Sequence, residues 1–135
     1  MLRVIMMFAV VGVLSACAGG QGDLNEAPVD LGDFSLHHNI VVASTAAKGP
    51  LSRDASEQEL QSAMETAIAE RFDRYNGSRK YHFGVSVEGY VLAAPGVPLV
   101  LAPKSIMIAN LTVWDNELVK KLNDPPHQIT VLGTF

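Results

Sequence analysis

Cysteine is nearly absent from this sequence: among 135 residues only Cys17 carries a thiol. A single cysteine cannot close a disulfide within its own chain, so packing alone must hold a folded domain together. Redox chemistry that depends on a pair of thiols is excluded for the same reason.

Positive charge is also scarce. Ten Lys and Arg residues stand against fourteen Asp and Glu residues, which gives a formal net charge of −4. An acidic chain is a poor match for nucleic acid or for anionic lipid headgroups, so we expect neither as the main partner. The sequence has no phosphate-binding loop, nucleotide fingerprint or paired-carboxylate pattern, and we therefore expect no cofactor.

The apolar run at the amino terminus is too short for a permanent membrane span. Val4–Leu14 has eleven residues, about 16 Å of helix, whereas a bilayer core of roughly 30 Å needs about twenty. Arg3 precedes this run, and the small residues Ser15 and Ala16 follow it. This order is typical of a signal peptide, predicted here over residues 1–16.

The residues at the cleavage point carry a more specific signal. Leu14-Ser15-Ala16-Cys17 resembles the lipobox of bacterial lipoproteins. The resemblance implies cleavage between Ala16 and Cys17 and a covalent lipid on Cys17, which would hold the protein to the cell envelope. Ala18 stands where an Asp often signals retention in the inner membrane, so the resemblance favours the periplasmic face of the outer membrane. Ordinary secretion is the alternative, because Ala16-Cys17-Ala18 also fits an A-x-A cleavage site.

The mature chain divides into a tether and one domain. Removing the leader removes one basic residue and no acidic one, which leaves a formal charge of −5. Residues 17–36 are rich in Gly and Asp and lack apolar periodicity, so they are predicted to be the lipidated cysteine and a flexible tether. Residues 37–135 are predicted to be a single α+β domain.

The clearest element is a helix over about 57–75. Ser56 and Glu59 form a capping-box pattern at its start, and Gly77 lies where a C-terminal cap is expected. Apolar residues at helical spacing predict one apolar stripe: Leu60, Ala63, Met64, Ala67, Ile68, Phe72 and Tyr75. Four basic residues near its end suit the helix dipole better than a ligand-binding patch: Arg71, Arg74, Arg79 and Lys80.

Strands are predicted on either side of this helix. Asn39–Ser44 is β-branched, and from Tyr81 to Glu88 apolar and polar residues alternate, with a bulge expected at Gly89. Ser105–Trp114 and Gln128–Phe135 complete the set, and Asp115 begins either a turn or a short helix. The fold class is therefore α+β, a mainly antiparallel, meander-like sheet of four to five strands (β-α-β-β-β) with the helix packed on one face.

One helix cannot cover all the apolar surface of these strands. The last strands carry apolar residues on both faces, and Pro95–Pro103 is unusually apolar for a connection. Val97, Leu99 and Leu101 are therefore predicted to form part of a surface for a protein partner or a second copy of the chain.

Candidate catalytic and metal-binding residues are weak. His82, Ser86 and Glu88 share a strand face. Four residues along a strand separate the Cα atoms of His82 and Ser86 by ~13 Å, which is too far for a nucleophile and its base. His37 and His38 are adjacent and should point to opposite faces of an extended chain. We therefore predict no catalytic residue and no metal site, and we expect Trp114 and the other aromatic residues to pack in the core.

These features favour a non-catalytic binding or accessory subunit that is lipid-anchored in the cell envelope. The α+β pattern after the anchor resembles small outer-membrane lipoproteins that serve as such subunits. Two alternatives stay open: a small-ligand or lipid carrier with a groove beside the helix, and a hydrolase whose site does not show in the sequence.

Overall fold

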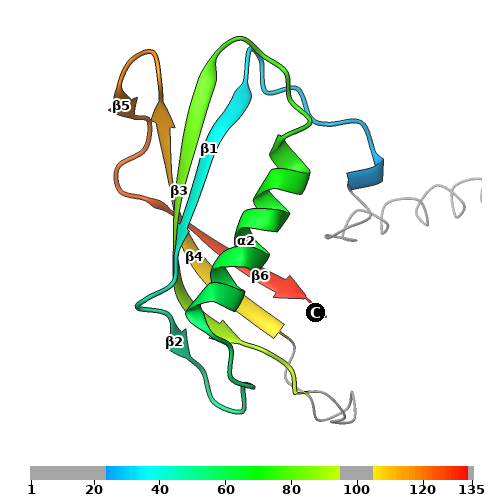
Figure 1. Cartoon of the computed structure of the whole chain (residues 1–135), viewed down its shortest axis with the longest axis vertical. Helices are drawn as coiled ribbons and strands as arrows, with labels where there is room; N and C mark the ends of the chain where they lie inside the picture. Colours follow the sequence, from blue (N-terminus) through cyan, green and yellow to red (C-terminus); the bar gives the residue numbers. More distant parts are fainter. Residues whose placement is uncertain (1–23, 95–104, 134–135) are drawn as a thin grey trace, which may run out of the picture.

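The computed structural model describes residues 24–94 and 105–133 and confirms the α+β class. One helix lies against a six-stranded sheet that is mixed but mostly antiparallel and does not close into a barrel (Figure 1). In chain order the elements are β1 (Ser35–Val42), β2 (Ala47–Lys48), α2 (Glu57–Phe72), β3 (Lys80–Val91), β4 (Ser105–Asp115), β5 (Lys120–Lys121) and β6 (His127–Gly133).

The sheet is built around β3 and β4, which pair antiparallel over almost their whole length. The short strand β2 continues the line of β1, and both run parallel to β3 along its other edge. On the far side of β4 lie β5 and β6, both antiparallel to it. The unit β1–α2–β3 is thus a parallel crossover through the helix, which an entirely antiparallel meander would lack.

The structure corrects the bounds of the first strand and decides between the two readings of the segment after Asp115, in favour of the turn. The first strand begins at Ser35 rather than Asn39, and it ends at Val42. The segment after Asp115 is a turn followed by the two-residue strand β5, and it holds no helix. The alternation of β3 and its bulge are confirmed, because Phe83, Val85 and Val87 are buried and the register with β4 shifts between Val87 and Gly89.

The start of the helix is confirmed and its predicted end is wrong. Ser56 is the N-cap, and its hydroxyl accepts a hydrogen bond from the amide of Glu59 at 3.1 Å. The helix ends at Phe72 with Asp73 as its C-cap, four residues before Gly77. Gly77 serves another purpose, since its amide donates to the carbonyl oxygen of Phe34 at 2.8 Å and the two backbones run in close contact.

The core lies between α2 and one face of the sheet. Leu60 of the helix packs with buried residues of β1, β3 and β4, namely Val41, Val85, Val87, Met107 and Ala109. A second cluster surrounds the ring of Phe34, whose centroid lies 5.1–6.0 Å from those of its aromatic neighbours: Phe72 at 6.0 Å, Tyr75 at 5.5 Å, Tyr81 at 5.1 Å and Phe83 at 6.0 Å. The predicted packing role of these four residues is confirmed.

The described part of the predicted tether lies against the domain. The carbonyl oxygen of Leu24 accepts a hydrogen bond from Arg74, and that of Val29 accepts one from the hydroxyl of Tyr75. Phe34 is buried, and Ser35 begins β1, so the domain begins before the predicted boundary at residue 37. None of the helices in the described ranges is long and apolar enough to span a membrane.

Candidate functional site

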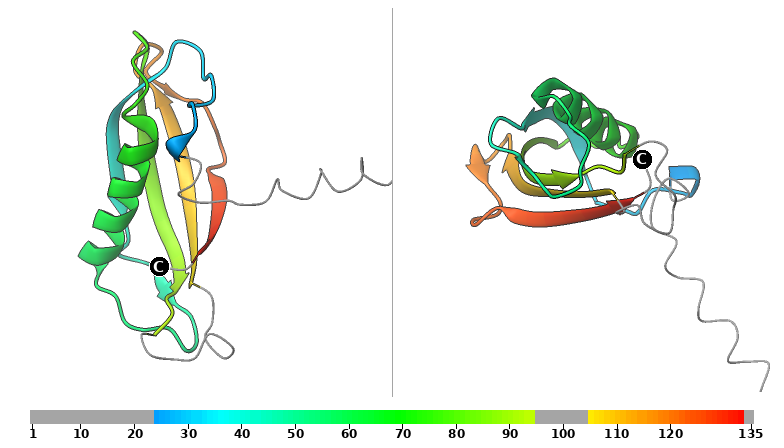
Figure 2. Two further views of the ribbon diagram at one scale, coloured as in Figure 1. Left: turned by 90° about the vertical axis from the view of Figure 1, so that its right-hand side faces the viewer. Right: turned by 90° about the horizontal axis from the view of Figure 1, so that it is seen from below.

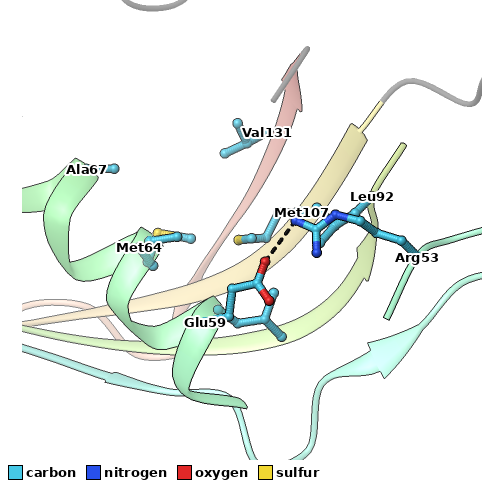
Figure 3. Close-up of a pocket in the computed structure, with 9 residues that line it drawn as sticks. Arg53, Glu59, Met64, Ala67, Leu92, Met107 and Val131 are labelled. Carbon is cyan, nitrogen blue, oxygen red and sulfur yellow. Dashed lines mark ion pairs between the residues drawn. The ribbon is translucent and has the colours of Figure 1, made fainter. Parts of the chain in front are cut away.

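An apolar groove lies between α2 and the β4–β6 side of the sheet. Its volume is about 180 Å³, and its lining comprises Arg53, Glu59, Leu60, Ala63, Met64, Ala67, Leu92, Met107 and Val131. Figure 3 shows Met64 and Ala67 of α2 on one side, Val131 of β6 opposite them, and Met107 of β4 below. The seven apolar members of this lining make the groove suited to hydrocarbon groups.

The groove exists because the sheet covers only part of the apolar stripe of α2. Leu60 is buried over the sheet, but Ala63 and Ala67 on the same helix are exposed. The helix contacts β1 most extensively, while the curved sheet carries β6 away beneath its other flank (Figure 2). The small side chains of Ala63 and Ala67 therefore line the groove together with Met107 of β4 and Val131 of β6.

The polar groups of the groove lie together at one end. The guanidinium of Arg53 and the carboxylate of Glu59 form an ion pair at 2.8 Å, drawn as a dashed line in Figure 3. Both side chains are partly exposed, so this pair contributes little to stability. The two charges therefore neutralise each other at one end of the groove, and the other seven residues of the lining are apolar.

The strand β6 gives the groove an accessible backbone edge. Its seven residues, HQITVLG, include neither proline nor a charged Lys, Arg, Asp or Glu. Within the described ranges β6 pairs with β4 alone. Natural edge strands commonly carry such charges or prolines to prevent pairing with other chains, and β6 lacks this protection.

A cluster of three histidines occupies the opposite face of the sheet. His38 of β1 is the register partner of His82 in β3, and their ring centroids are 5.0 Å apart. The ring of His37 lies 4.3 Å from that of His38 and 5.4 Å from that of His82. The prediction that His37 and His38 point to opposite faces is wrong, because the register slips at this point and leaves His37 as an extra, unpaired residue of a bulge.

The neighbours of His37 disfavour its charged form. Partial desolvation lowers the pKa of His37 most, and the positive charges of His38, Lys80 and His82 lower it further. The ring of His82 is held in place by Asn116, whose side-chain oxygen lies 2.9 Å from its Nε2. The fourth histidine, His127, lies on β6 and is not part of this cluster.

The remaining predicted residues lie apart from the groove. Ser86 and Glu88 follow His82 along β3, and none of the three lines the groove. Trp114 was predicted to be a core residue and is instead 39% exposed on the face opposite α2. It lines a shallow depression there with Ile40 and Val42 of β1, which are also exposed.

Asp115 is a buried polar residue that its sequence context did not reveal. Its side chain is 1% exposed and accepts hydrogen bonds from Arg79 at 2.5 Å, from the amide of Glu117 at 2.9 Å and from that of Leu118 at 3.0 Å. Arg79 therefore forms an ion pair with Asp115, and Arg74 donates a hydrogen bond to the carbonyl oxygen of Leu24. Two of the four basic residues near the end of the helix thus have separate partners within the chain. The alternation of β4 was the signal that could have revealed it, because residue 115 has the same parity as the buried residues Met107 and Ala109.

Other predicted site residues fall outside the described ranges. These are the cleavage and lipidation residues Ala16 and Cys17, and the proposed partner-surface residues Val97, Leu99 and Leu101. Comparison with protein-family models, curated proteins and solved structures found no match for this chain.

Proposed function

We propose that this protein is a lipid-anchored envelope protein that binds an extended segment of a partner protein without catalysing a reaction. The observation that supports this most strongly is the position of the apolar groove directly beside the unprotected edge of β6. A polypeptide can use both features at once, whereas a lipid can use only the groove.

The register of β4 and β6 supports a particular fit for such a partner. Met107 of β4 is the cross-strand partner of Val131 in β6, and both line the groove. A strand added beside β6 would extend this row by one residue on the same face. Because side chains alternate along a strand, every second residue of the partner would lie next to the groove. We therefore expect a partner segment with apolar residues at alternate positions.

The proposed anchor makes this mode of binding effective. A lipid on Cys17 would confine the domain to a membrane surface, where an envelope partner is present at high local concentration. Weak pairing at the β6 edge would then be enough for association.

Site-specific crosslinking in intact cells tests the proposal. A photo-activatable amino acid at Ala67, in the groove, should capture a discrete protein, and the same probe at the exposed Glu70 of α2 should not. Val131→Lys should abolish the adduct, because it places a charge in the groove and at the edge strand. Leu118→Lys is the matched control, since Leu118 is 52% exposed in the turn after Asp115 and lies outside both the groove lining and β6.

Three results would count against this function. They are failure to capture any protein from Ala67, equal capture from Glu70, and equal loss of the adduct in both lysine variants. Capture of a lipid in place of a protein would support the carrier alternative and overturn the protein-binding proposal.

A further inference from the structure

The histidine cluster on the face opposite the groove has the composition of a transition-metal site. Imidazole nitrogens are suitable ligands for Zn²⁺, Cu²⁺ and Ni²⁺. Here three of the chain's four histidines lie within ring contact of one another, although they come from two strands separated by the whole of α2. A bulge is what brings the adjacent His37 and His38 together.

The spacing of the rings fits one shared ion. With metal–nitrogen distances of about 2.0–2.1 Å and tetrahedral angles, three imidazoles on one Zn²⁺ have ring centroids roughly 5 Å apart. The three observed separations are 4.3, 5.0 and 5.4 Å. In the described ranges no group of three His, Cys, Asp or Glu side chains is already arranged around a metal position. Binding therefore requires the rings to turn, and His37 and His38 are exposed side chains whose rotamers exchange readily.

The third histidine is already oriented by a neighbour. A carboxamide oxygen can only accept a hydrogen bond, so His82 donates to Asn116 across 2.9 Å in the tautomer that carries its proton on Nε2. This leaves the lone pair of Nδ1 available to a metal. Metal-bound histidines characteristically donate their second N–H to an oxygen in this way, which fixes the tautomer and the direction of the ring.

From these relationships we propose that His37, His38 and His82 bind one divalent transition-metal ion of the Zn²⁺ class, with Asn116 as the partner that orients His82. Three protein ligands leave the fourth position of a tetrahedral ion to water or to an external ligand. The site lies on the other side of the sheet from the groove, and it does not depend on the proposed protein-binding function.

Calorimetric titration of the full chain in detergent micelles, purified without a histidine tag, tests this proposal with Zn²⁺ alone. We expect one ion per chain. His37→Ala, His38→Ala and His82→Ala should each weaken binding at least about tenfold, and Asn116→Ala by about tenfold, the range typical of outer-shell partners. His127→Ala is the matched control and should leave the affinity unchanged, because His127 lies outside the cluster.

Two further measurements keep the result decisive. Far-UV circular dichroism shows whether each variant is folded, and the X-ray absorption spectrum of the Zn²⁺-bound wild-type chain should show three imidazole nitrogens at about 2.0–2.1 Å. The proposal is overturned by the absence of one-to-one binding, by equal weakening in His127→Ala, or by a spectrum with fewer than three imidazole ligands.

Discussion

The backbone of Gly77 lies against that of Phe34, with the amide of Gly77 bonded to the carbonyl oxygen of Phe34 at 2.8 Å. A Cβ atom at Gly77 would overlap the backbone of Phe34. This contact joins the segment before β3 to the residue at the centre of the aromatic cluster.

Gly77→Ala should therefore destabilise the protein by about 1–3 kcal/mol, the usual cost of forcing extra atoms into a packed site. Gly84→Ala is the control, because the nearest atom to its added Cβ would be the carbonyl oxygen of Thr112 at 4.0 Å. We expect that variant to lie within about 0.5 kcal/mol of wild type. Urea unfolding of both variants measures the difference, and equal stability of the two would show that the Phe34 contact is not tight.

The hydrogen bonds to the buried Asp115 carboxylate make the stability of the fold depend on pH. Hydrogen bonds from the Leu118 amide, from Arg79 and from the Glu117 amide hold the pKa of Asp115 below its ordinary value of 3.8, although burial acts in the opposite direction. A lowered folded-state pKa means that the charged form stabilises the fold above the unfolded-state value. That stabilisation is lost as the pH falls through the lower, folded-state pKa.

Asp115→Asn removes this charge at every pH. The gap in unfolding free energy between wild type and this variant should be widest at neutral pH and should narrow below about pH 4. Asp54→Asn is the control: the ion pair with Lys48 also lowers the pKa of Asp54, but 90% of the Asp54 side chain is exposed, so solvent should keep this gap small at every pH. Urea midpoints measured between pH 3 and pH 7 test this. A gap for Asp115→Asn that stays constant with pH would contradict it.

Leu60 is the one residue of α2 that is buried, at 3% exposure. Leu60→Ala should lower the unfolding free energy by about 2–5 kcal/mol, because it leaves a cavity between the helix and the sheet. Leu118→Ala, at a residue that is 52% exposed in the turn after β4, should change it by no more than about 0.5 kcal/mol. Thermal unfolding of both variants compares them directly, and similar midpoints would show that α2 contributes little to the core.

The parts of the fold that the sequence predicted are those set by local signals. The Ser56 cap and the period-two pattern of β3 depend on near neighbours, and both are present. Phe34 was assigned to the tether because Gly and Asp surround it. Its burial depends on aromatic rings from α2 and β3, which no short window of sequence contains.

The candidate sites required tertiary geometry. The predicted apolar stripe of α2 included Ala63 and Ala67, but which of its residues the sheet would leave uncovered depends on the curvature of the sheet. In the same way, one inserted residue at His37 brings its ring beside that of His38, against the expected alternation. A bulge is fixed by pairing with β3, and the sequence of β1 alone does not specify it.

The lipid anchor is a prediction with its own decisive variant. Cys17→Ser removes the thiol that would receive the lipid, so we expect an uncleaved precursor that incorporates no labelled fatty acid, whereas the wild-type chain is cleaved and labelled. Immunoblotting after metabolic labelling with a fatty-acid analogue reads both properties at once. Ordinary secretion makes the opposite prediction, because cleavage at an A-x-A site does not need a thiol. Normal maturation of Cys17→Ser, with no label on the wild-type chain, would therefore assign the leader to simple export. It would also leave the groove and the β6 edge on a freely diffusing domain, without the high local concentration that compensates for weak pairing.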